Sequence, residues 1–275
     1  MRSKYRQFME EDIGSGDITS ELVVPADAKA RGRIVCKEPC VLAGAKEASQ
    51  VFKDLGAKAL VRKRDGSRVK KGDVVLEVQG TARALLAGER LVLNIIMRMS
   101  GIATLTDSLV RKCRKINPKV KVAATRKTTP GFREFEKRAV ELGGGWPHRM
   151  GLYDAILIKN NHIRIAGDVR TAVVRARKKS HGRKIEIEVE TPEQAYTALE
   201  NGADIIMLDN FEPAEAGRLI RELKKKRHGL LIELSGGIRP ENIEEYALNA
   251  DIISLGWLTH SVKSIDFSMK IEPEE

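Results

Sequence analysis

The chain has 275 residues, of which 42% are hydrophobic and 32% are charged. This composition supports a buried core in one large domain or two ordinary ones and excludes intrinsic disorder as the main state. No apolar run approaches the roughly 18 residues of a membrane-spanning helix, and Met1–Phe8 is charged rather than signal-like. We therefore expect a soluble, cytoplasmic protein with no membrane partner.

The cysteine content and the charge further limit the class of protein and its possible partners. Cys36, Cys40 and Cys113 are too few for a disulfide framework and poorly spaced for zinc, so we expect reduced, buried thiols. The net charge of +11 permits nucleic acid, a membrane surface or an anionic small molecule as partner, and residues 101–150 hold 12 basic against 4 acidic side chains. Aromatic residues make up only 4%, which disfavours a base-stacking surface and leaves nucleic acid as the weakest alternative.

The first hundred residues predict a small sheet covered by helices. Alternating runs of strand type occupy residues 32–37, 58–61 and 74–78, separated by turns, and helical patterns cover residues 45–55 and 85–99. We expect an N-terminal α+β domain with a mixed sheet, of the open-sandwich kind, over residues 1–104. The C-terminal segment 262–275 is a candidate to complete it.

From residue 120 onward, strand-length apolar runs alternate with helical segments, which predicts an α/β domain over residues 105–261. The expected strands are 120–125, 155–159, 184–190, 204–209, 230–234 and 251–255. A helix capped by Thr191, one capped by Asp168, and one opening at Arg239-Pro240 lie between them. Polar residues follow every strand, which favours a partly open β/α barrel of about six parallel strands over an open doubly wound sheet.

The strand at 184–190 alternates Glu186, Glu188 and Glu190 with apolar residues. A period of two turns the carboxylates into the barrel, where cations, a metal or water must compensate them. Asp209 ends the next strand. Carboxylates from adjacent strand ends suit Mg²⁺ carrying water and phosphate oxygens, so Glu188 and Asp209 are candidate metal ligands. Pairing of the glutamates with Lys or Arg alone is the structural alternative.

Two further sets of residues indicate anionic ligands. Ser235-Gly236-Gly237 and Gly256 follow the last two strands, where barrels often bind phosphate through main-chain N–H groups. A basic set follows the first two strands and indicates a ligand with more than one negative group; it comprises Arg126, Lys127, His148, Arg149 and Lys159. Arg90, on a polar stripe of the 85–99 helix, faces either solvent or a ligand.

These residues lie in strings that resemble a known family. They include TRKTTPGFR (125–133), GGGWPHRMGLYDAILIKNNHI (143–163), EIEVE (186–190), IMLDNF (206–211), ELSGGI (233–238) and SLGWLTHS (254–261), with EDIGSGDITS (11–20), VKKGDVVLEVQG (69–80) and ERLVLNIIMRMSGIAT (89–104) in the N-terminal part. Together they resemble quinolinate phosphoribosyltransferase, the nicotinate-nucleotide pyrophosphorylase of NAD biosynthesis. Asn160 stands where the family pattern has Asp, and Trp146-Pro147 is an unusual pair of residues at the positions before His148-Arg149.

The resemblance implies transfer of 5-phosphoribosyl from phosphoribosyl pyrophosphate to quinolinate with loss of carbon dioxide, giving nicotinate mononucleotide and pyrophosphate. It implies Mg²⁺ bound with phosphoribosyl pyrophosphate, no organic cofactor, and a homodimer with shared active sites or a hexamer. Arg126, His148, Arg149 and Lys159 would hold the quinolinate carboxylates, with Arg90 from the neighbouring subunit and Lys127 near the pyrophosphate. Glu188 and Asp209 would bind Mg²⁺ and ribose, and the 5-phosphate would lie on Ser235, Gly236, Gly256 and His260.

The alternative within this architecture is a paralogue with another acceptor, either a ModD-type protein linked to molybdate transport or an enzyme that uses nicotinate. The pocket of two Arg and one Lys favours a dicarboxylate over a monocarboxylate.

Overall fold

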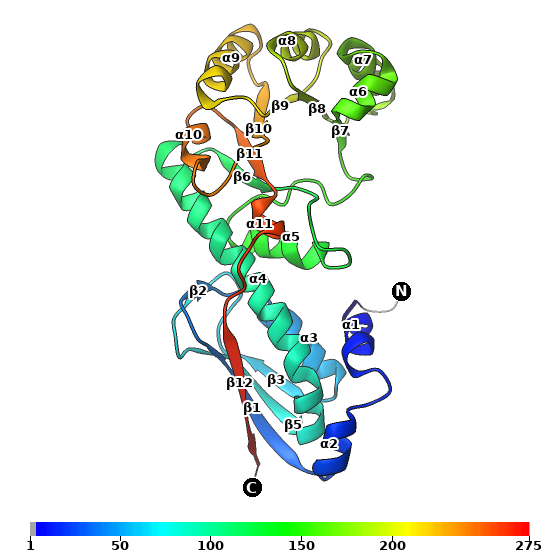
Figure 1. Cartoon of the computed structure of the whole chain (residues 1–275), viewed down its shortest axis with the longest axis vertical. Coiled ribbons are helices and arrows are strands. Elements are labelled where there is room, and N and C mark those ends of the chain that lie inside the picture. The colour runs from blue at the N-terminus through cyan, green and yellow to red at the C-terminus, as the bar shows by residue number, and fades with distance from the viewer. Residues whose placement is uncertain (1–3, 275) are drawn as a thin grey trace. The chain divides into compact units, whose positions relative to one another are not determined.

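The computed structural model describes residues 4–274, so residues 1–3 of the expected first domain and Glu275 lie outside the description. The chain forms two compact units, which are labelled by element in Figure 1. The first unit contains residues 4–105, 141–143 and 262–274, and the second contains residues 106–140 and 144–261. Within residues 4–274, no helix combines the length and apolar character needed to cross a membrane.

The first unit is built on a four-stranded sheet in the order β12-β1-β5-β3, beside a two-stranded ladder of β2 and β4. The strands are β1 (Lys29–Cys36), β2 (Cys40–Val41), β3 (Lys58–Val61), β4 (Arg68–Val69), β5 (Val74–Thr81) and β12 (Phe267–Pro273). All neighbours pair antiparallel, so the expectation of a mixed sheet was wrong. The alternation along β1 explains this: Arg31 and Arg33 are exposed while Ala30 and Ile34 are buried, and antiparallel sheets tolerate one solvated face.

The main helices of this unit are α1 (Lys4–Ile13), α2 (Ile18–Val23), α3 (Ala45–Asp54) and the first part of α4 (Ala82–Ile116). Helix α4 is longer at both ends than the 85–99 segment that the sequence predicted. The polar stripe that indicated this helix does not continue regularly beyond residue 99, so the pattern did not predict the rest of the helix. The first strong helix breaker after residue 99 is Pro118. Cys36, Cys40 and Cys113 are free and buried, as expected, and burial raises the pKa of Cys113 to about 11.

The second unit is a curled sheet of six parallel strands in the order β6-β11-β10-β9-β8-β7. The strands are β6 (Lys121–Ala124), β7 (Ile156–Ile158), β8 (Ile185–Val189), β9 (Ile205–Asp209), β10 (Leu231–Ser235) and β11 (Ile252–Leu255). Strands β6 and β7 form the two edges and do not pair with each other, so the predicted partly open β/α barrel is confirmed.

Helices cover the outer side of this sheet, as Figure 1 shows for α7, α8 and α9. The helices that follow the strands are α5 (Arg133–Leu142), α6 (Asn160–Ala166), α7 (Val169–Lys179), α8 (Pro192–Glu200), α9 (Pro213–Lys226), α10 (Ile243–Ala247) and α11 (Trp257–His260). Thr191 and Asp168 cap α8 and α7 through main-chain N–H groups, as predicted. The helix expected to open at Arg239-Pro240 begins only at Ile243, because residues 239–242 form a turn.

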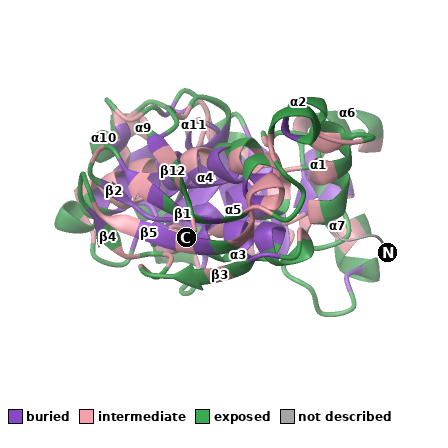
Figure 2. Cartoon of the chain, turned by 90° about the horizontal axis from the view of Figure 1, so that it is seen from below, coloured by how far each residue is buried: buried purple, intermediate pink, exposed green. Residues whose placement is uncertain are grey.

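Core packing agrees with the strand assignments. Buried residues are found in α4, β1 and β5 (Figure 2), and all five residues of β8 are buried. The segment after α5 also joins the barrel: the Trp146 N–H donates to the Val122 carbonyl (2.8 Å), and the Ala124 N–H donates to the Trp146 carbonyl (2.9 Å). Gly145 permits this approach, because a Cβ there would lie 3.1 Å from the Val122 carbonyl and closer still to Thr106. Residues 146–149 therefore reach the carboxyl end of β6.

Candidate active site

The polar residues at the strand ends line one pocket of about 430 Å³ in the second unit. Its wall comprises Ala124, Thr125, Arg126, Lys127, His148, Arg149, Leu157, Lys159, Glu188, Met207, Asp209, Glu233, Ser235, Gly236 and Ser254. The pocket brings together all the predicted site residues except Arg90, Gly256 and His260. The carboxyl ends of parallel strands meet at one edge of the sheet, which is why residues so far apart in the sequence converge.

Gly256 and His260 lie beside this wall without lining it. A Cβ on Gly256 would lie 2.6 Å from the His260 ring and 2.8 Å from the Lys127 side chain. The Thr259 hydroxyl donates to the Lys127 carbonyl (2.7 Å), which ties α11 to the loop after β6. Arg90 is exposed on α4 in the first unit and is not part of the pocket lining.

Two arginines converge at the basic side of the pocket. Arg149 is buried, and both burial and the nearby positive charge of Arg126 lower its pKa. The buried Nε of Arg126 has no hydrogen-bond partner among residues 4–274. Like charges held together, with a buried donor unsatisfied, are the arrangement expected of a site that an anion completes.

The acidic side of the pocket lies on the neighbouring strand ends. Lys159 Nζ donates to Glu188 Oε2 at 2.8 Å. Pairing with a lysine, the structural alternative to metal binding, is therefore observed for this glutamate. Burial, and then the negative charge of Glu188, raise the pKa of Asp209. A carboxylate whose pKa is raised by a neighbouring carboxylate marks a place that favours a cation.

The glycine turn after β10 forms a third part of the wall. Gly236 has φ +81°, and a Cβ there would lie 2.6 Å from the main-chain nitrogen of Asn210, so only glycine fits. The helix expected directly after this turn begins six residues later, at Ile243, whereas α11 follows Gly256 immediately. The turn after β10 therefore offers main-chain N–H groups without a helix terminus behind them.

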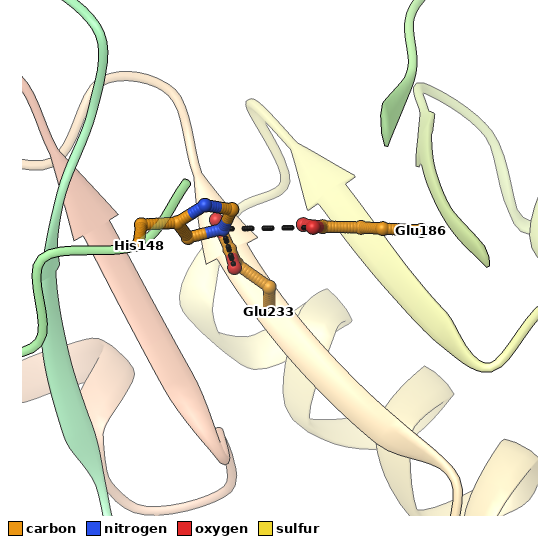
Figure 3. Close-up of side chains that lie close together, drawn as sticks. All are labelled: His148, Glu186 and Glu233. Carbon is orange, nitrogen blue, oxygen red and sulfur yellow. Dashed lines mark hydrogen bonds and ion pairs between the residues drawn. The ribbon is translucent and has the colours of Figure 1, made fainter. Parts of the chain in front are cut away.

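His148 occupies a left-handed backbone conformation (φ +53°) and turns its ring into the barrel. Its Nε2 lies 3.0 Å from Glu233 Oε2 and 3.5 Å from Glu186 Oε2, as Figure 3 shows. Burial alone would lower the pKa of His148, but the hydrogen bonds and charges of these two carboxylates outweigh it and raise the pKa to about 9. Sequence reasoning placed Glu186 inside the barrel but missed Glu233, whose strand shows no alternation of carboxylates.

A larger hollow of about 580 Å³ lies on the exposed face of the antiparallel sheet in the first unit. Its charged side chains already form cross-strand pairs, such as Arg33 with Glu272 at 2.8 Å. It holds no strand-end polar cluster, so the barrel pocket is the better candidate for chemistry.

A parallel barrel whose strand ends hold cations, carboxylates and a glycine turn in one pocket defines an enzyme of the β/α-barrel class that binds anionic substrates. Comparison with known proteins assigns the family. Residues 17–100 match the N-terminal domain of quinolinate phosphoribosyl transferase, and residues 102–270 match its C-terminal domain. The chain belongs to the quinolinate phosphoribosyl transferase family.

The similarity extends over nearly the whole chain. A probable carboxylating nicotinate-nucleotide pyrophosphorylase from Archaeoglobus fulgidus is 46% identical over 93% of this chain and 98% of its own length. The carboxylating nicotinate-nucleotide pyrophosphorylase of Rattus norvegicus is 36% identical over 97% of this chain and 89% of its own. The crystal structure of NadC from Streptococcus pyogenes superposes with a TM-score of 0.91 at 37% identity, covering 98% and 96% of the two chains.

Proposed function

We propose that this protein transfers the 5-phosphoribosyl group of phosphoribosyl pyrophosphate to quinolinate and releases pyrophosphate and carbon dioxide, giving nicotinate mononucleotide for NAD biosynthesis. The observation that carries the proposal is the pairing of Arg126 and Arg149 in one pocket with a carboxylate pair and a glycine turn. A diacid and a phosphorylated sugar need these two kinds of surface side by side. The cytoplasm is the expected compartment.

Arg126, Arg149 and Lys159 are the cations proposed to hold the two quinolinate carboxylates. Arginine binds a carboxylate through two parallel N–H groups, which fixes the plane of the ring as well as its position. Arg126 retains an unpaired donor, and Lys159 reaches the pocket from the end of β7. Lys159 also contacts Glu188, so it connects the acceptor side of the pocket with the sugar side.

Phosphoribosyl pyrophosphate is proposed to lie on the opposite wall. Lys127 lies near the leaving pyrophosphate, and the 5-phosphate lies on Ser235, Gly236, Gly256 and His260. The neighbouring carboxylates of Glu188 and Asp209 are only partly neutralised by nearby cations. They therefore fit Mg²⁺, and the pocket leaves room for water and phosphate oxygens as further ligands. The ion would neutralise charge on the pyrophosphate.

The main contribution that the reaction requires of the protein is to position the two substrates. The bond between ribose C1′ and pyrophosphate breaks, and the ring nitrogen of quinolinate forms the new C–N bond. The ring nitrogen is then positive, so the electron pair left at C2 by departing carbon dioxide is stabilised before a proton from water replaces it. Fixed cations that align two anionic substrates supply this catalysis without a covalent intermediate.

The acceptor assignment predicts the behaviour of Arg149→Ala. Loss of a buried charge partner should weaken quinolinate binding by about 2 to 5 kcal/mol, and Lys159→Ala should act in the same direction. Carbon dioxide release from carboxyl-labelled quinolinate measures turnover, and Arg170→Ala, on the exposed surface of α7, is the matched control. Wild-type kinetics in Arg149→Ala, or turnover of nicotinate in place of quinolinate, would contradict the assignment.

The metal assignment predicts a change in the magnesium dependence. Glu188→Ala should require a higher Mg²⁺ concentration for half-maximal use of phosphoribosyl pyrophosphate, because one of two carboxylate ligands is gone. Glu190→Ala, two residues further on and outside the pocket lining, should titrate like the wild type. An unchanged magnesium titration in Glu188→Ala would make that residue only the ion-pair partner of Lys159.

We further propose that the enzyme is a homodimer, or a larger assembly of dimers, in which Arg90 enters the pocket of the neighbouring subunit. The exposed position of Arg90 and its absence from its own chain's pocket lining support this arrangement.

Subunit mixing tests the shared site. Arg90→Ala and Lys159→Ala, each impaired alone, should regain activity when mixed, because a mixed dimer has one complete site. Random exchange should restore roughly a quarter of the wild-type sites. Arg149→Ala mixed with Lys159→Ala should recover nothing, since each barrel then carries a defect. Mixed dimers verified by mass spectrometry but lacking recovered activity would exclude a shared Arg90.

A further inference from the structure

The segment Pro147–Met150, which presents Arg149 to the pocket, is held from two sides by residues that the proposed reaction does not use. It is irregular backbone rather than helix or strand, and His148 within it adopts the left-handed conformation. A non-glycine residue in that region costs energy and persists only where its surroundings fix it.

The ring of His148 is one point of attachment. Figure 3 shows Glu186 from β8 and Glu233 from β10 converging on Nε2. Glu233 is fully buried and Glu186 is 4% exposed, and the Oε1 atom of each has no hydrogen-bond partner among the described residues. The ring is the group that both buried carboxylates contact, and the charge of Arg149 also acts on Glu186.

The two nitrogens of the ring receive different contacts. The Arg149 N–H lies 2.8 Å from Nδ1, an interaction that favours the neutral ring, while the carboxylates favour the charged ring. A full charge at 3.0 Å outweighs one main-chain dipole. The proton on Nε2 is present in both forms, so the bond to the carboxylates does not depend on the charge of the ring.

The main chain of the segment is the second point of attachment. Arg133 and Lys137 lie one turn apart on α5 and donate to the carbonyls on either side of His148-Arg149. Arg133 Nη1 lies 3.1 Å from the Met150 carbonyl, and the buried Lys137 Nζ donates to the Pro147 carbonyl. Burial, and then the positive charge of Arg133, lower the pKa of Lys137 to about 8.

We propose that Glu233 and Glu186 are positioning residues for the quinolinate site: they hold the His148 ring inside the barrel and thereby fix the neighbouring Arg149 guanidinium in the pocket. This inference rests on the proposed function. It assigns His148 a role in holding the segment beside its place in the pocket wall, because its Nε2 contacts both carboxylates.

The proposal distinguishes two effects that a substitution can have on substrate binding. A residue that only stabilises the fold affects both substrates alike when it is changed. A residue that positions Arg149 affects quinolinate and leaves phosphoribosyl pyrophosphate nearly unchanged, because the groups proposed to bind the sugar, Glu188, Asp209 and the turn after β10, lie outside the segment Pro147–Met150.

The test replaces Glu233 by the isosteric amide. Glu233→Gln keeps the shape of the side chain and removes its charge. We expect the Kd for quinolinate, measured by calorimetry without phosphoribosyl pyrophosphate, to rise about tenfold, because the hydrogen bond from the His148 ring then has a neutral acceptor in place of a charged one. The Kd for phosphoribosyl pyrophosphate should stay within about twofold. Glu47→Gln, which neutralises a buried glutamate of α3 in the first unit, is the matched control and should bind both substrates like the wild type.

Nuclear magnetic resonance supplies a readout that a purely structural role would not move. The chain has five histidines, so His148 can be assigned by its substitution. Its ring should titrate near pH 9 in the wild type and at a lower pH in Glu233→Gln. If Glu233→Gln does not fold, Glu186→Gln, measured in the same way, decides the question. Wild-type quinolinate affinity in a folded variant, or a His148 midpoint in that variant equal to the wild-type midpoint, would overturn the inference. Failure of the wild type to bind quinolinate would instead refute the proposed function.

Discussion

The stability of the barrel depends on the compensation of charges that are buried at one end of its parallel sheet. Glu186, Glu188 and Glu233 lie inside the barrel, and Arg149 is buried beside them. Isolated ions in such surroundings would be prohibitively expensive. Basic groups from other segments therefore meet these carboxylates, as in the pairs of Lys159 with Glu188 and His148 with Glu233. The compensation leaves an excess of positive charge around Arg126 and of negative charge around Asp209. These are the two sides proposed to hold the diacid and the metal-bound sugar phosphate.

Much of this arrangement could be predicted from the sequence, because parallel strands bring their carboxyl ends together whatever the details of packing. The apolar runs located all six barrel strands within one or two residues at each end, and the residues after them include those that line the pocket. The period-two pattern of Glu186 and Glu188 correctly placed both carboxylates inside the barrel.

Other features had no local signal. Glu233 is a single carboxylate within an apolar strand, and its role appears only when β10 lies between β9 and β11. Helix α4 extends past its predicted ends, where the polar stripe that indicated it is no longer regular. The turn at residues 239–242 delays α10, although Arg239-Pro240 resembles a helix start. The antiparallel sheet of the first unit depends on β12, more than 200 residues distant from β1 in the sequence. Each of these depends on tertiary contacts that no short window contains.

A crystal structure of the protein with quinolinate and without phosphoribosyl pyrophosphate tests the central claim most directly. The account predicts both carboxylates of the ligand within hydrogen-bonding distance of Arg126, Arg149 and Lys159, with its ring nitrogen directed toward Glu188 and Asp209. Density for the diacid at another surface, with these three side chains directed away from a common cavity, would contradict it.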